Sequence, residues 1–124
     1  MKKLITLVAV TLAVALSGAA MAHSEKPKHG GIVSTASDLS FELVNQEGRT
    51  TLYITDHGKP LDTNGVTGKL TVLNGSEKTE VPLEPDGANK LLAKEDAKLA
   101  KGSKVVASLV FPGKKNVNVR FSVK

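Results

Sequence analysis

Short runs in which apolar and polar residues alternate are the feature that most constrains the fold of this chain. A period of two puts every second side chain on the same face of a strand, so each run predicts a half-buried strand. A run that is apolar at nearly every position instead predicts a central strand, and only Ser108 interrupts such a run from Val105 to Phe111. The alternating runs are Leu39–Leu43, Leu52–Ile54, Leu70–Val72, Val81–Leu83, a weaker Leu91–Ala93, and Val117–Val123.

Residues that favour tight turns separate these runs, among them Asn74-Gly75 and Asp86-Gly87. About seven or eight short strands spaced in this way predict an antiparallel β-sandwich of immunoglobulin-like type over residues 32–124. Only residues 95–100 have the composition of a helical turn. The predicted core includes Leu70, Val72, Leu109, Val119 and Phe121.

The first 22 residues have the organisation of a secretory signal peptide. Two lysines precede an apolar run from Leu4 to Leu16, and the small residues Ala20 and Ala22 occupy the positions that a signal peptidase reads. The apolar run is shorter than the roughly 20 residues that a membrane span requires. We therefore expect cleavage after Ala22 and a soluble periplasmic protein of bacterial type, with no membrane attachment after processing. The polar residues 23–31 then predict a flexible N-terminal arm.

The composition excludes several kinds of partner. The net charge of +5 falls by two when the signal peptide takes Lys2 and Lys3 with it, and the chain has one tyrosine and no tryptophan. Nucleic-acid binding, which needs a basic face and stacking aromatic rings, is therefore not expected. A core filled mainly by valine and leucine also leaves no aromatic-lined pocket for an organic ligand.

Sulfur is absent from the expected mature chain. There is no cysteine, and Met1 and Met21 both leave with the signal peptide. Thiolates and thioethers select Cu(I), whereas imidazole suits Cu(II), Zn(II) and Ni(II). A Cu(I) site is therefore disfavoured, and any metal chemistry depends on histidine.

All three histidines lie outside the predicted core, and together they form a candidate metal site. Cleavage after Ala22 makes His23 the first residue, so that its α-amine and imidazole can chelate one ion; cleavage after Ala20 would place it third and create a different chelate. His29 precedes Gly30-Gly31, which either permit a close approach of the chain to a neighbour or form a plain turn. His57 lies beside Asp56 where a strand ends, and it either joins the site when the arm folds back or is an exposed turn residue.

Parts of the sequence resemble a known group of proteins. The chain is similar to small periplasmic proteins found with heavy-metal efflux systems in three segments: His29-Gly30-Gly31, residues 41–44, and residues 53–61 around Asp56-His57-Gly58. The His-Gly-Gly segment is also similar to a segment of the periplasmic adaptor subunits of such pumps. A mature N-terminal histidine before a β-sandwich also resembles CopC-type copper carriers, of which only His23 carries over. The resemblance covers the N-terminal half of the mature chain and implies metal handling.

Three classes of function follow. The first is a periplasmic metal-binding protein that contributes to heavy-metal handling or resistance, with Cu(II) as the metal, Zn(II) or Ni(II) as less favoured alternatives, and a periplasmic efflux component as a partner. The second is a non-catalytic accessory module that binds another cell-envelope protein. An enzyme is not expected, because no nucleophile motif is visible and Asp56 and His57 are merely adjacent.

Overall fold

The computed structural model of the chain describes residues 26–124, which contain nine strands and no helix. The predicted signal peptide and His23 lie outside the described residues. The strands are β1 (Ile32–Ala36), β2 (Leu39–Gln46), β3 (Arg49–Asp56), β4 (Lys59–Pro60), β5 (Thr67–Asn74), β6 (Glu77–Pro85), β7 (Lys90–Ala93), β8 (Lys104–Phe111) and β9 (Lys115–Ser122).

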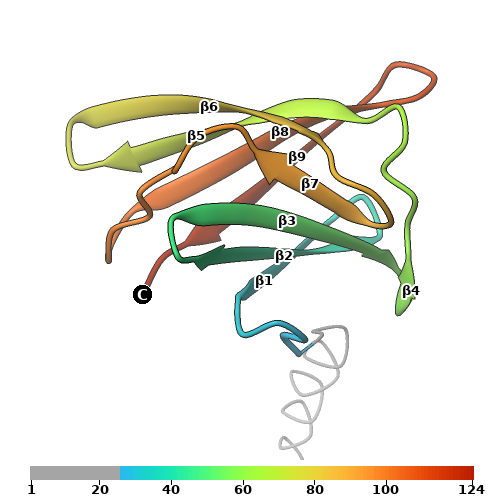
Figure 1. Cartoon of the computed structure of the whole chain (residues 1–124), viewed down its shortest axis with the longest axis horizontal. Helices are drawn as coiled ribbons and strands as arrows, with labels where there is room; N and C mark the ends of the chain where they lie inside the picture. The colour runs from blue at the N-terminus through green and yellow to red at the C-terminus, as the bar shows by residue number, and fades with distance from the viewer. Residues whose placement is uncertain (1–25) are drawn as a thin grey trace, which may run out of the picture.

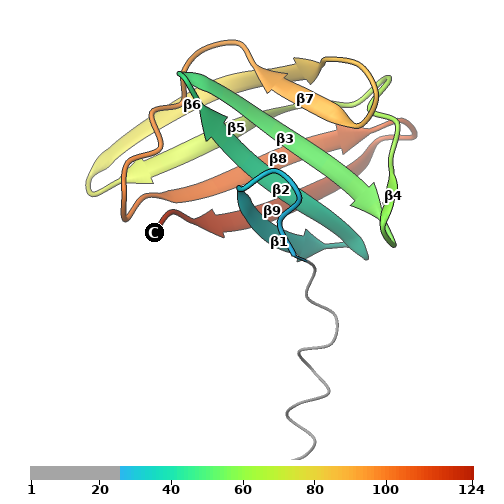
Figure 2. The same ribbon diagram turned by 60° about the horizontal axis from the view of Figure 1, so that its bottom comes forward.

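All nine strands belong to one antiparallel sheet, with the order β1-β2-β3-β7-β6-β5-β8-β9 and with β4 paired to the end of β3. The sheet curls until β1 lies against β9, which makes a nearly closed barrel (Figure 1; Figure 2). The predicted immunoglobulin-like sandwich of two sheets is therefore wrong, although the prediction of an all-β antiparallel domain is confirmed.

The short strand β7 is the physical reason for this difference. It pairs with β3 through Thr51–Tyr53 on one side and with β6 through Leu83–Pro85 on the other. Backbone hydrogen bonds therefore continue across what would be the gap between two stacked sheets. Alternation tells which face of a strand is buried, but it carries no information about which strands pair. The weakest of the predicted strands thus decides the architecture.

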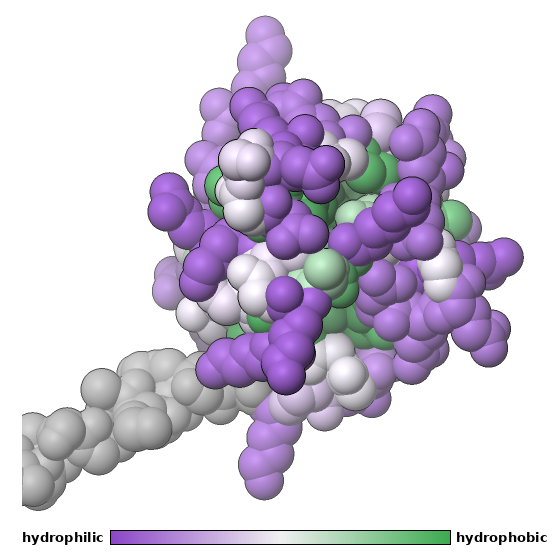
Figure 3. All heavy atoms as spheres, turned by 90° about the vertical axis from the view of Figure 1, so that its left-hand side faces the viewer, coloured by the Kyte–Doolittle hydropathy of each residue, from purple (hydrophilic) through white to green (hydrophobic). Residues whose placement is uncertain are grey.

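The alternating residues fill the inside of the barrel. The five residues predicted for the core are all buried, with Leu70 fully enclosed and Phe121 3% exposed. On β9 the outward residues Asn118 and Arg120 are exposed while their neighbours in the chain are buried, as the pattern predicts. The described surface is mostly hydrophilic where Figure 3 shows it, with small apolar areas between the charged side chains.

Two finer predictions need correction. Strand β8 pairs on both sides, as expected of a central strand, but its outward face is not buried, since Val110 is 40% exposed. Residues 95–100 form no helical turn; the buried Ala97 instead packs into the core from an irregular segment. In the described part of the chain, no helix has the length and apolar character to cross a membrane.

Candidate functional site

Glu42 connects the N-terminal arm to the outside of the barrel. In β2 the side chains of Phe41 and Leu43 point into the core, so the side chain of Glu42 points outward, yet this side chain is only 8% exposed. The arm loops back over it, and the backbone N–H groups of Lys28, His29 and Gly31 donate to the carboxylate at 3.1, 2.8 and 2.9 Å. Residues 28–31 are thereby bound to β2.

The two glycines after His29 have different roles in this contact. Gly30 has a φ of 75°, a left-handed conformation that glycine adopts without strain. A Cβ atom at Gly31 would collide with the carbonyl oxygen of Leu43 and lie 2.8 Å from Cγ2 of Val44. The pair therefore provides both the turn and the close approach, and the plain-turn alternative is insufficient.

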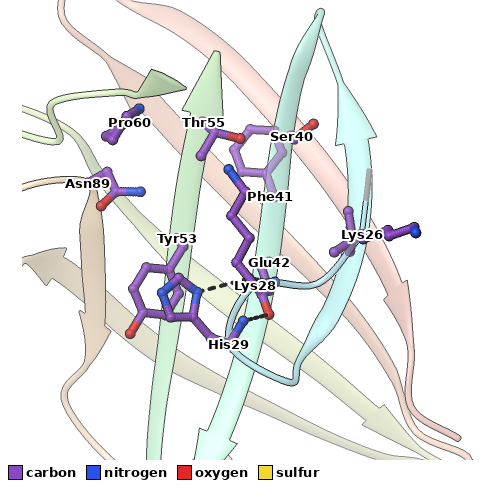
Figure 4. Close-up of a pocket in the computed structure, with 11 residues that line it drawn as sticks. Lys26, Lys28, His29, Ser40, Phe41, Glu42, Tyr53, Thr55, Pro60 and Asn89 are labelled. Carbon is purple, nitrogen blue, oxygen red and sulfur yellow. Dashed lines mark hydrogen bonds and ion pairs between the residues drawn. The ribbon is translucent and has the colours of Figure 1, made fainter. Parts of the chain in front are cut away.

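The imidazole of His29 is held between a carboxylate and an aromatic ring. Its Nδ1 lies 3.0 Å from Oε1 of Glu42, and its ring stacks on Tyr53 with a centroid separation of 3.8 Å and an interplanar angle of 5° (Figure 4). Tyr53 is the cross-strand partner of Glu42, so the two side chains lie next to each other on the outer face. Because an ionised carboxylate only accepts hydrogen bonds, the Nδ1 of His29 carries the hydrogen.

This arrangement leaves Nε2 as the nitrogen of His29 with a free lone pair in the neutral ring. Histidine ligands in metal sites commonly donate their other N–H to a carboxylate, which fixes the tautomer and the ring orientation. The side chain of His29 is 42% exposed, so solvent reaches it. His29 therefore has the surroundings of a pre-oriented metal ligand.

The hydrogen bonds also determine the ionisation of Glu42. Burial alone would raise the pKa of this carboxyl, but hydrogen bonds from the His29 side chain and from the amides of Gly31, His29 and Lys28 together lower the pKa below its usual value. Glu42 is therefore ionised at neutral pH, in the form that holds the arm.

The lowered pKa predicts that the arm detaches in acid. A carboxyl whose pKa is lower with the arm docked than with the arm detached stabilises the docked arm above the detached-state pKa, and this contribution is lost as the pH falls through the docked-state pKa. We expect the amide signals of Lys28, His29 and Gly31 to shift together below the usual glutamate pKa in an NMR titration. Glu42→Gln should abolish this step, and a step that persists in that variant would contradict the assignment.

His57 occupies a different place. It has a φ of 52° on the turn after β3, and its side chain is 82% exposed, with Nδ1 2.6 Å from Oδ1 of Asp56. It lines a separate hollow with residues 35–40 rather than the surroundings of His29. Within residues 26–124, no group of three or more His, Cys, Asp or Glu side chains is arranged to hold a metal ion. The arm thus docks on Glu42 and Tyr53 instead of on the His57 turn.

Sequence reasoning did not identify Glu42 and Tyr53 as part of this site. Both stand at outward positions of predicted strands, where polar side chains are ordinary. The signal that was available is the His-Gly-Gly segment, since a glycine that permits close approach implies a neighbour. That neighbour is known only once β2 and the arm lie together in three dimensions.

Comparison of the chain with models of protein families, with curated proteins and with solved structures finds no match. The site is therefore interpreted from its own geometry.

Proposed function

We propose that this chain is a periplasmic Cu(II)-binding protein whose site combines His29 with an N-terminal His23, and that it contributes to heavy-metal handling without being an enzyme. The observation that carries the proposal is the contact of His29 with Glu42, which orients the imidazole and leaves Nε2 available. Cu(II) is favoured over Zn(II) and Ni(II) because it forms the most stable complexes with nitrogen ligands.

The length of the chain is compatible with a shared site. His23 precedes Lys26 by three residues, and an extended chain spans at most about 3.6 Å per residue. Lys26 itself lines the hollow next to His29. With cleavage after Ala22, the α-amine and imidazole of His23 would supply two nitrogen ligands on a residue whose Cα lies within about 11 Å of the Cα of Lys26.

A titration of Cu(II) into the secreted protein tests the proposal, after intact mass has established that it begins at His23. Because Tyr53 is the only tyrosine and the chain has no tryptophan, its fluorescence reports on the stacked ring of His29. We expect one equivalent of Cu(II) to quench this fluorescence, with an affinity that declines as the pH falls, because protons compete with the metal for the ligand nitrogens. Cu(I) should bind much more weakly.

Substitutions of single histidines measure how much each one contributes to Cu(II) binding. His23→Ala or acetylation of the α-amine should weaken Cu(II) binding most, and His29→Ala should weaken it by at least about tenfold. His57→Ala is the matched control, since this imidazole also contacts a carboxylate but lies on an exposed turn. Equal and weak binding by the wild type and the His23→Ala and His29→Ala variants would contradict the proposal and favour the accessory-module alternative.

A further inference from the structure

A hollow of about 200 Å³ lies beside His29, on the outer face of β2 and β3. Tyr53 and the arm border it at one end, and Pro60 of β4 and Asn89 border it on another side (Figure 4). The Asn89 side chain is itself oriented by a hydrogen bond of 3.0 Å to the carbonyl oxygen of Ile54. Segments distant in the sequence therefore form the hollow together. It lies outside the barrel core, and the absence of an organic-ligand pocket was expected only for that core.

The electrostatic character of the hollow is cationic. Lys26 and Lys28 line it, and neither has an ion-pair partner among residues 26–124. The side chain of Lys28 extends toward Ser40 and Thr55, whereas that of Lys26 points away (Figure 4). Glu42 is the one carboxylate among the lining residues, and its oxygens are already occupied by the arm.

The polar and apolar groups of the hollow are separated. Ser40 and Thr55 are cross-strand partners, and both line the end of the hollow toward which Lys28 extends. The ring of Tyr53, Pro60 and the side chain of Val33, which is the cross-strand neighbour of Glu42, provide apolar surface. An ammonium group and two hydroxyl-bearing side chains at one end of a hollow suit an oxyanion, and the apolar walls suit a small hydrocarbon body.

We propose that this hollow binds a small amphipathic organic anion, with its carboxylate or phosphate group at Lys28, Ser40 and Thr55 and its apolar part against Tyr53 and Pro60. The volume limits the ligand to a single ring or a short chain. The proposal concerns the metal-free protein, so it is independent of the Cu(II) site, although both use the surroundings of His29.

A titration followed by NMR tests the proposal on the secreted protein after treatment with EDTA. The probes are benzoate and phenyl phosphate, with uncharged benzamide as the control of matching shape. We expect benzoate or phenyl phosphate to shift the amide signals of residues 26–29, 40–42, 53–55 and 89, and benzamide to cause little change. Lys28→Ala should weaken binding of the anion by about tenfold, because a charge-assisted hydrogen bond is lost.

One control variant and one further variant of the hollow complete the test. Lys115→Ala removes the same charge from a residue that does not line the hollow, and it should leave binding unchanged. Ser40→Ala should weaken binding less than Lys28→Ala, since a neutral hydroxyl contributes a weaker hydrogen bond. The proposal is overturned if neither anion shifts these signals, if benzamide binds equally well, or if the Lys28→Ala and Lys115→Ala variants behave alike.

Discussion

We expect Phe121→Ala to lower the free energy of unfolding by about 3–5 kcal/mol, because a large aromatic side chain is removed from a closed core. Phe121 is 3% exposed and points into the barrel from β9, where it pairs with Val105 of β8. The lost methylene and ring contacts leave a cavity that the surrounding strands fill only in part. Chemical denaturation monitored by circular dichroism measures this loss as a lower midpoint with an unchanged slope.

Phe111→Ala is the matched control for this prediction. Phe111 is only partly buried and packs against the edge of the same core from the end of β8. Its truncation removes the same atoms but less buried surface, so its effect should be clearly smaller. Equal losses for the two variants would contradict the deeper burial of Phe121 relative to Phe111.

We expect Glu42→Ala to detach the arm while the barrel remains folded. The variant removes the acceptor of three backbone amides and of the His29 side chain at once. Since the released amides are hydrated at a chain end, global stability should change little, whereas their protection from hydrogen exchange should decrease by about a hundredfold. Hydrogen exchange of Lys28, His29 and Gly31 by NMR measures this local effect. The same variant should weaken Cu(II) binding by about 10–100-fold if Glu42 orients the ligand.

Glu84→Ala provides the control for the loss of a carboxylate. Glu84 also points outward from its strand, but it forms an exposed ion pair with Lys94 at 3.3 Å, and such pairs contribute little. It should leave both the arm and Cu(II) binding unaffected. If Glu42→Ala, like Glu84→Ala, leaves the hydrogen exchange of the three arm amides unchanged, then the carboxylate of Glu42 does not hold the arm.

The sequence predicts the local structure of most strands, but it does not predict which distant strands pair. Alternation in β3, β5 and β9 correctly predicts which residues are buried, because the pleat of a strand is a local property. In β2 it does not, because the arm also covers the outward Glu42. The error lies in β7, whose four residues have the weakest pattern of those predicted. Its simultaneous pairing with β3 and β6 converts an expected sandwich into a barrel, and nothing within its own sequence specifies two partners.

At the candidate site, too, some features follow from the sequence and others only from the tertiary structure. The sequence by itself determined that His29 and His57 lie outside the core, that sulfur ligands are absent after the expected cleavage, and that Gly30-Gly31 permits an unusual turn or a close approach. Only the tertiary structure decided that His29, and not His57, is held by a buried carboxylate, and that Tyr53 stacks on it. The physical reason is that turn and strand preferences act between neighbours in the chain, whereas the contact between Glu42 and the arm joins residues 11 to 14 positions apart through the folding back of one segment on another.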